Sequence, residues 1–325
     1  MFLTVPVLWF RISKMPDKKI KILLDNVGTV VKGKPQAVKL AVVTLIGRGH
    51  LLIEDVPGIG KTTLAHTLAR SINCSFHRIQ FTSDLMPSDI TGVTIFNQTT
   101  QAFEFKPGPV FANIVLADEI NRTTPKTQSA LLEAMNEGQV SVEKKTYPLP
   151  SPFMVIATQN PLEFHGTFPL PESQMDRFMM RIKLGYPEPS VEKEILRAHS
   201  EEGMKAEVAA VLNAEEVGAL QSQAEKVRMD ESLLEYIVSI VDATRRDGRL
   251  ALGVSPRGML FLQRTARASA LVEGRDYCIP DDIKSLAVAV LAHRVVPNYR
   301  SGMARRAEDA VEVIKEIVES VEVPV

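Results

Sequence analysis

The sequence predicts an α/β fold in which a five-stranded parallel sheet carries β-hairpin inserts and is followed by a helical region. Five short apolar runs alternate with helical stretches, which is typical of a parallel sheet covered by helices on both faces. Two further segments alternate between apolar and polar residues around polar turns. After a proline-containing turn at 186–189 the pattern is helical. We therefore expect a disordered or non-native tail at 1–17, an α/β core at 18–187 and a helical lid domain at 188–325.

Each element follows from its local pattern. A helical region at 18–48, broken near Gly33, precedes the first apolar run. The runs that predict strands are 50–55, 76–81, 113–118, 153–158 and 180–184. Helices are predicted at 61–71 and 125–137, and hairpins at 92–105 and 139–149. Beyond the turn, helical periodicity covers 191–201, 214–226, 231–247, 256–272, 280–293 and 304–321.

Composition excludes several classes of protein. The 325 residues suggest about two domains, and 38 Lys and Arg against 39 Asp and Glu argue against a surface built for nucleic acid. The two cysteines, Cys74 and Cys278, form no CxxC pair and the histidines are scattered, so neither a disulfide framework nor a metal site of protein ligands is expected. Because no apolar run reaches about 18 residues, we expect no membrane insertion and a cytoplasmic protein.

A glycine-rich loop between a predicted strand and a predicted helix indicates a phosphate site. Glycines at 58 and 60 let the backbone point successive N–H groups at phosphate oxygens, and the following helix adds its positive end. Lys61 would reach the β- and γ-phosphates of a nucleotide, and the Thr62 hydroxyl would bind Mg²⁺. The generic pattern begins with glycine, whereas this chain has Asp55 there. The residues of the loop that we expect to contact nucleotide are Pro57, Gly58, Ile59, Gly60, Lys61, Thr62 and Thr63.

A second acidic motif follows the third predicted strand. Asp118 and Glu119 end an apolar run, and a strand parallel to the first would deliver both carboxylates to the phosphate end of the sheet. Asp118 would hold Mg²⁺ through water, and Glu119 would orient and deprotonate the attacking water. An acid pair that caps the next helix is the structural alternative. The pair predicts hydrolysis of ATP with Mg²⁺ and not nucleotide binding alone.

These residues and their surroundings resemble the MoxR family of AAA+ ATPases. The resemblance spans roughly residues 33–294. Its motifs are Gly49-His50-Leu51-Leu52-Ile53-Glu54-Asp55-Val56-Pro57-Gly58, Arg78-Ile79-Gln80-Phe81-Thr82-Ser83-Asp84-Leu85-Met86-Pro87-Ser88-Asp89-Ile90-Thr91-Gly92, Gly108-Pro109-Val110-Phe111, Ala117-Asp118-Glu119-Ile120-Asn121-Arg122, Ala157-Thr158-Gln159-Asn160-Pro161, Pro169-Leu170-Pro171-Glu172, Asp176-Arg177-Phe178 and Val254-Ser255-Pro256-Arg257. It implies an AAA+ P-loop NTPase core with a helical lid, assembled as a ring that is usually a hexamer.

The resemblance assigns roles to residues that the motifs above leave open. Asn160 matches sensor 1, Arg177 the arginine finger that reaches a neighbouring subunit's γ-phosphate, and Arg257 sensor 2. Val31 and Gly33 match the adenine-side segment. The structural alternatives are a turn residue for Asn160, a salt bridge of Arg177 with Asp176 or Glu172, surface charge for Arg257 and helix packing for the adenine-side pair. Arg122 is a rival or additional trans arginine.

The resemblance also implies a chaperone-like task that matures or activates partner proteins, in some cases by inserting a metal cofactor. The partners it implies are proteins with von Willebrand factor A domains or other clients, with no nucleic acid. Two alternative functions remain open. An AAA+ nucleic-acid motor is supported only by Lys144 and Lys145 at a hairpin tip. A nucleotide-gated scaffold with little turnover is opposed by Glu119.

Overall fold

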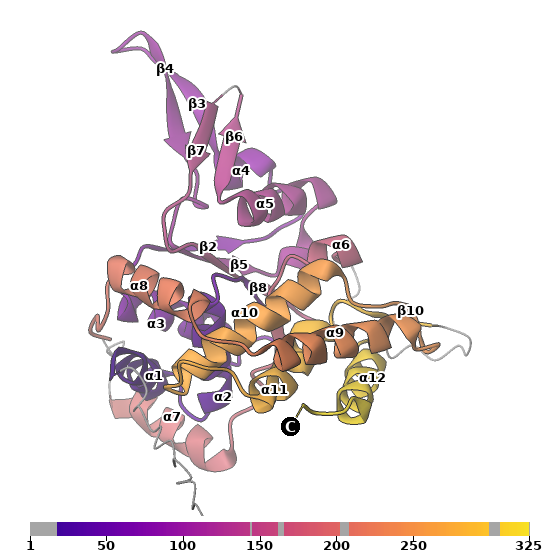
Figure 1. Cartoon of the computed structure of the whole chain (residues 1–325). Coiled ribbons are helices and arrows are strands. Elements are labelled where there is room, and N and C mark those ends of the chain that lie inside the picture. The colour runs from indigo at the N-terminus through magenta and orange to yellow at the C-terminus, as the bar shows by residue number, and fades with distance from the viewer. Residues whose placement is uncertain (1–17, 144, 162–165, 202–207, 299–305, 325) are drawn as a thin grey trace, which may run out of the picture.

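The computed structural model describes residues 18–143, 145–161, 166–201, 208–298 and 306–324. The predicted tail and Lys144 lie outside these ranges. An α/β part is followed by a helical part, as expected (Figure 1). In chain order the elements of the first part are α1 (Lys18–Val30), α2 (Pro35–Ile46), β1 (Leu51–Glu54), α3 (Lys61–Ser71), β2 (Phe76–Gln80), α4 (Pro87–Thr91), β3 (Gly92–Asn97), β4 (Ala102–Pro107), β5 (Ile114–Asp118), α5 (Pro125–Glu137), β6 (Gln139–Val142), β7 (Lys145–Pro148), β8 (Met154–Gln159), α6 (Glu172–Met175) and β9 (Met180–Ile182).

The central sheet has five parallel strands in the order β2-β5-β8-β1-β9. Its strands read as continuous apolar runs because both faces are covered. Leu51 and Ile53 of β1 face one apolar cluster, which includes α1, α2 and α3, whereas Leu52 faces the cluster that includes α4 and α5. Such two-sided burial removes the alternation that a half-exposed strand would show. The expected sheet and its helical cover are confirmed.

Both predicted hairpins are present and project from the same end of the molecule (Figure 1). Phe105 of the β3–β4 hairpin stacks on Tyr147 of the β6–β7 hairpin, with ring centroids 4.2 Å apart, which joins the two ribbons. Phe96 and Phe103 form an edge-to-face pair farther along the first hairpin, and both are exposed. The inserts therefore form one projection.

The helical part contains α7 (Pro189–Glu201), α8 (Ala214–Glu225), α9 (Glu231–Arg246), α10 (Pro256–Val272), α11 (Pro280–Leu291) and α12 (Arg306–Ser320). The expectation of a purely helical region is wrong in one detail. Strands β10 (Leu250–Leu252) and β11 (Val296–Pro297) pair antiparallel, too short to leave a periodic signal in the sequence. Apolar residues of this part join the cluster on one face of the sheet. Among the described residues, no helix is long and apolar enough to span a membrane.

His50 connects three segments of the core. Its Nδ1 accepts a hydrogen bond from Val155 N at 3.0 Å, which leaves Nε2 as the donor to the Met135 carbonyl at 3.0 Å. Burial lowers the pKa of His50 to about 4, because a charged imidazole loses its hydration there. The neutral ring is therefore part of the folded structure at neutral pH.

Acidification should destabilise the protein through His50. Between its ordinary pKa of 6.5 and about 4, the unfolded chain binds a proton that the folded chain does not, so the free energy of unfolding falls as the pH is lowered through this window. His50 alone should contribute about 3 kcal/mol across it. Urea unfolding of the wild type and His50→Gln at several pH values tests this. The free energy of unfolding of His50→Gln should depend less steeply on pH than that of the wild type. The control His77→Gln, at an exposed histidine, should keep the wild-type dependence. An unchanged slope for His50→Gln would contradict the prediction.

Candidate functional site

An open cavity of about 430 Å³ lies at the carboxyl edge of the sheet, where the loop after β1 meets the end of β5. Only β8 separates the two strands, so parallel geometry carries their following residues to the same edge. The cavity is lined by Pro57, Gly58, Gly60, Lys61, Thr62, Thr63, Arg78, Gln80, Asp118 and Glu119. The structure thus brings together the core of both predicted motifs. Ile59 is part of the same loop but does not line the cavity.

The loop that begins the cavity has the backbone that a phosphate site needs. Gly58 and Gly60 have φ of 82° and 94°, in the left-handed region, which a side chain makes costly. Gly60 is also the N-cap of α3, so the loop runs directly into a helix N-terminus. Lys61 is largely buried, and its Nζ donates to the Asp55 carbonyl at 2.6 Å. The ammonium group is thereby folded back onto the loop and held beside the cavity.

Asp55, the departure from the generic loop pattern, fastens the start of the loop to the chain beyond β9. Its Oδ2 accepts hydrogen bonds from Leu184 N at 2.8 Å and Gly185 N at 2.7 Å, and its Oδ1 accepts one from Val56 N at 2.9 Å. A glycine at this position could make none of these contacts. The aspartate therefore ties the phosphate loop to the segment that leads into the helical part.

Thr158 positions both acidic residues from the neighbouring strand β8. Its hydroxyl donates to Asp118 Oδ1 at 2.6 Å and accepts from Glu119 N at 2.9 Å. Glu119 has a φ of 58°, which is strained for a residue other than glycine. Held in this way, the Glu119 carboxylate lines the cavity. Backbone strain maintained by a buried neighbour is typical of functional residues.

Two residues of β2 contact the same carboxylates, and sequence reasoning assigned them no role. Arg78 donates to Asp118 Oδ2 through Nη2 at 2.6 Å and through Nε at 3.1 Å. Gln80 accepts from Arg78 at 2.7 Å and donates to Glu119 Oε2 at 2.8 Å. The available signal was two polar side chains two positions apart, on one face of a strand expected to be buried. Arg78 and Gln80 thus form a hydrogen-bonded chain to Glu119 from β2, which lies on the side of β5 away from β1 and its phosphate loop.

The oxygen donors in the cavity fit Mg²⁺, which prefers carboxylate and hydroxyl oxygens. Asp118 and Thr62 both line it, from the end of β5 and the start of α3. A carboxylate has about four lone-pair sites, so the bonds to Arg78 and Thr158 leave capacity on Asp118. The donor set thus matches the predicted metal residues.

Comparison with known proteins agrees with this geometry. The sequence model of the ATPase family associated with various cellular activities (AAA) matches residues 50–180, and that of the AAA lid domain matches residues 242–317. An uncharacterized protein of Bacillus subtilis, YeaC, is 47% identical over 93% of this chain and 94% of its own. Chaperone MoxR1 of Mycobacterium tuberculosis is 42% identical over 92% of this chain and 81% of its own.

The chain belongs to the MoxR family of AAA ATPases. A crystal structure of a candidate ATPase from Cytophaga hutchinsonii superposes with a TM-score of 0.86 at 41% identity, covering 94% of this chain and 95% of that one. The AAA fold with its lid is therefore established for this MoxR-family protein.

The other predicted site residues of this MoxR-family chain are not among the residues that line the cavity. Asn160 is buried directly after β8, between the strands that carry the two motifs. Val31 is buried at the end of α1. A Cβ added to Gly33 would lie 3.1 Å from Val191 of α7, so this segment packs against the beginning of the helical part. Their roles toward a nucleotide stay predictions.

The three candidate arginines differ in their contacts. Arg122 pairs with Glu119 of its own chain, with Nε 3.2 Å from Oε2. Arg257, near the N-terminus of α10, lies 3.9 Å from Asp176. Arg177 is half-buried, and burial together with the charge of Arg257 lowers its pKa. Its Nε has no hydrogen-bond partner among the described residues.

Proposed function

We propose that the chain hydrolyses ATP with Mg²⁺ and that it does so in a homo-oligomeric ring, a hexamer by the family resemblance. The observation that carries the proposal is the convergence of Lys61, Thr62, Asp118 and Glu119 on one cavity. Lys61 and the loop N–H groups would bind the β- and γ-phosphates, and Thr62 and Asp118 would hold the metal. When bound there, Mg²⁺ would offset the phosphate charge. Glu119 would orient the water and accept its proton.

The remaining residues complete the proposed mechanism. Asn160 would position water against the γ-phosphate, and Val31 with Gly33 would lie on the adenine side. Arg257 would reach the nucleotide of its own subunit from the lid, and Arg177 that of the neighbour, since arginine pairs with phosphate through two parallel hydrogen bonds. Loss of the γ-phosphate would release both arginines, which would change the angles of the lid and of the subunit interface together. In this mechanism the helical lid domain comprises residues 188–325 and the α/β core comprises residues 18–187.

We propose that this cycle of ATP binding and hydrolysis remodels a partner protein. This proposal is supported by the name of a relative, Chaperone MoxR1, together with the family resemblance. The proposed clients are proteins with a von Willebrand factor A domain or other proteins that need maturation, which includes insertion of a metal cofactor. Action in the cytoplasm belongs to the same proposal.

The test is phosphate release from ATP by the purified chain with and without Mg²⁺, beside Lys61→Ala. The wild type should turn over ATP only with Mg²⁺. The variant should bind ATP about 10- to 100-fold more weakly, because charge-assisted hydrogen bonds to phosphate are lost. Its control is Lys226→Ala, at an exposed lysine beyond α8. Absence of Mg²⁺-dependent turnover in the wild type would refute the proposal. Stimulation by DNA that falls steeply with salt would instead favour a nucleic-acid motor.

A further inference from the structure

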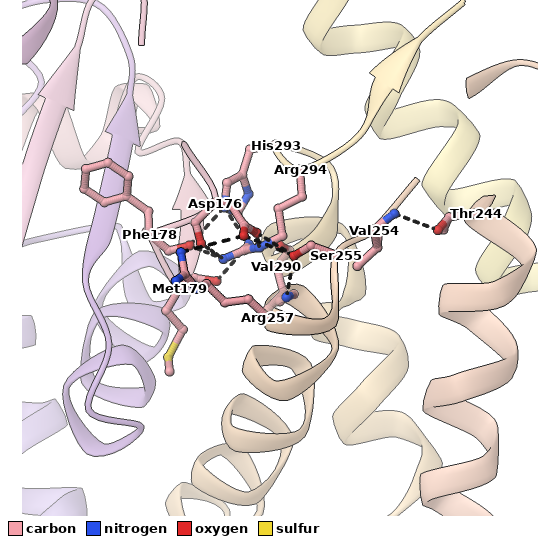
Figure 2. A network of polar contacts seen from close by, with 11 residues as sticks. Asp176, Phe178, Met179, Thr244, Val254, Ser255, Arg257, Val290, His293 and Arg294 are labelled. Carbon is pink, nitrogen blue, oxygen red and sulfur yellow. Dashed lines mark hydrogen bonds and ion pairs between the residues drawn. The ribbon is translucent and has the colours of Figure 1, made fainter. Parts of the chain in front are cut away.

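The segment that carries Arg177 contacts two adjacent buried residues of the helical part, Arg294 and His293, and His293 Nε2 lies 3.1 Å from the Phe178 carbonyl oxygen. Arg294 follows α11 by three positions and points toward Asp176 (Figure 2), and its side chain is fully buried. The chain positions before and after Arg177 both contact it. Arg294 donates hydrogen bonds to Asp176 Oδ1 at 3.0 Å and to the carbonyl oxygens of Asp176, Phe178, Met179 and Val290.

We call the contacts of Arg294 with Asp176 and with the Phe178 carbonyl the clamp. Asp176 is the counter-ion in this clamp and also contacts the start of α10. Both of its carboxylate oxygens accept from Ser255 Oγ at 3.1 Å. Ser255 is in turn the N-cap of α10 and accepts from Gly258 N at 3.1 Å. Arg257 lies 3.9 Å from the same carboxylate. One side chain of the α/β part therefore connects the beginning of α10 and the end of α11, as Figure 2 shows.

The surroundings hold the Arg294 guanidinium firmly. Its Cζ lies 5.0 Å from the centroid of the Phe261 ring, and Nη1 lies 2.6 Å from His293 Nε2. Burial lowers the pKa of Arg294 to about 10, so it remains charged at neutral pH. Burial and the Arg294 charge hold the pKa of His293 well below its usual range, so this imidazole is neutral. A buried charge that lost its partners would be costly, which keeps the arrangement in place.

The Arg177 side chain interacts with the charges of Glu133 and Glu137 of α5. It is half-buried, and its Nε is without a hydrogen-bond partner among the described residues. Its position also depends on its backbone, which Arg294 clamps through the carbonyls of Asp176 and Phe178. A catalytic side chain must be held to within roughly 0.5 Å to be effective. The same backbone is also hydrogen-bonded within the α/β part, because Arg177 N donates to Gln174 O and Phe178 N to Met175 O, so it lies between the two parts of the chain.

We propose that Arg294 is a positioning residue for Arg177, with Asp176 as its counter-ion, so that the lid of one subunit sets the arginine presented to its neighbour's ATP. The inference rests on the proposed function, because Arg177 acts on a neighbour only in a ring. It supplies a path along which the nucleotide state sensed by one lid alters hydrolysis in the next subunit. The path runs through Arg294 and the backbone of 176–178 and needs no contact between the two nucleotides.

Mixed rings separate this role from an effect on the subunit's own site. Arg294→Lys keeps the charge but removes the guanidinium fork, and its ATPase rate should fall on the order of 10²-fold, part of what an arginine finger supplies. ATP affinity should change by less than about twofold, because the cavity is untouched. Glu119→Gln subunits should be inactive yet present an intact Arg177. Mixing the two variants should therefore restore activity above the sum of the separate preparations.

Several outcomes would overturn the positioning role. If the mixture is no more active than the sum of its components while Arg177→Ala with Glu119→Gln does recover, Arg294 acts on its own site. The matched control is Arg246→Lys on α9, at an exposed arginine, which should leave the ATPase rate unchanged. Asp176→Asn weakens the clamp from the other side and should also recover in mixed rings. If neither clamp variant folds, the network is only a stabilising contact. Absence of turnover in the wild type refutes the ATPase proposal itself, and turnover without recovery refutes only the positioning role.

Discussion

Replacing Glu119 by glutamine should reduce ATP hydrolysis by about 10²- to 10⁴-fold while ATP binding persists. The amide has nearly the same shape as the carboxylate, so Gln80 and Arg122 can still contact it, but it cannot accept a proton from water. The backbone at φ of 58° and its hydrogen bond from Glu119 N to the Thr158 hydroxyl do not involve the carboxylate, so they are the same in either form. The loss should therefore fall on the rate of hydrolysis and leave the affinity for ATP in place.

The measurement pairs single-turnover hydrolysis with ATP binding on the same preparations. Glu235→Gln on α9, at an exposed glutamate, is the matched control and should retain the wild-type rate. Weakened ATP binding in Glu119→Gln would mean that the carboxylate supports the loop and is not the base. Unchanged turnover would favour the scaffold alternative, in which hydrolysis is not the purpose of the site.

The fold could be predicted largely because its patterns are local. The strands around Leu51–Glu54 and Ile114–Asp118 are covered on both faces, so each reads as an uninterrupted apolar run. The phosphate loop was identifiable for a similar reason, since its glycines, Lys61 and Thr62 are consecutive in sequence. Burial of consecutive residues and a contiguous loop both leave a signal within a few positions.

Contacts between distant positions could not be predicted in the same way. Asp176 and Arg294 lie 118 residues apart, and neither has a local pattern that distinguishes it from a surface charge. Arg78 and Gln80 are two polar residues of a strand until β2 is placed beside β5, which brings them to Asp118 and Glu119. The two-stranded β10–β11 pairing likewise depends on packing of the surrounding helices and not on its own few residues.

Arg177→Ala should abolish the dependence of specific activity on protein concentration and reduce the saturated rate by about 10³- to 10⁵-fold, the range that an arginine finger supplies. In the wild type, activity per subunit should rise and then level off as rings assemble, because each site is completed by a neighbour. The variant keeps the cavity residues, so its ATP affinity should remain close to that of the wild type. Steady-state ATPase assays over a range of concentrations, with light scattering to report assembly, measure both effects.

Arg122→Ala distinguishes the two candidate trans arginines. Arg122 contacts Glu119 of its own chain at 3.2 Å, whereas Arg177 lies outside the cavity of its own chain. If Arg177 is the finger, its alanine variant should recover in mixed rings with Glu119→Gln, and Arg122→Ala should not, because its defect stays with its own site. The opposite result would assign the trans role to Arg122. Wild-type turnover that is independent of concentration while scattering shows only monomer would mean that neither arginine acts on a neighbour, and the chain would be a self-contained nucleotide switch.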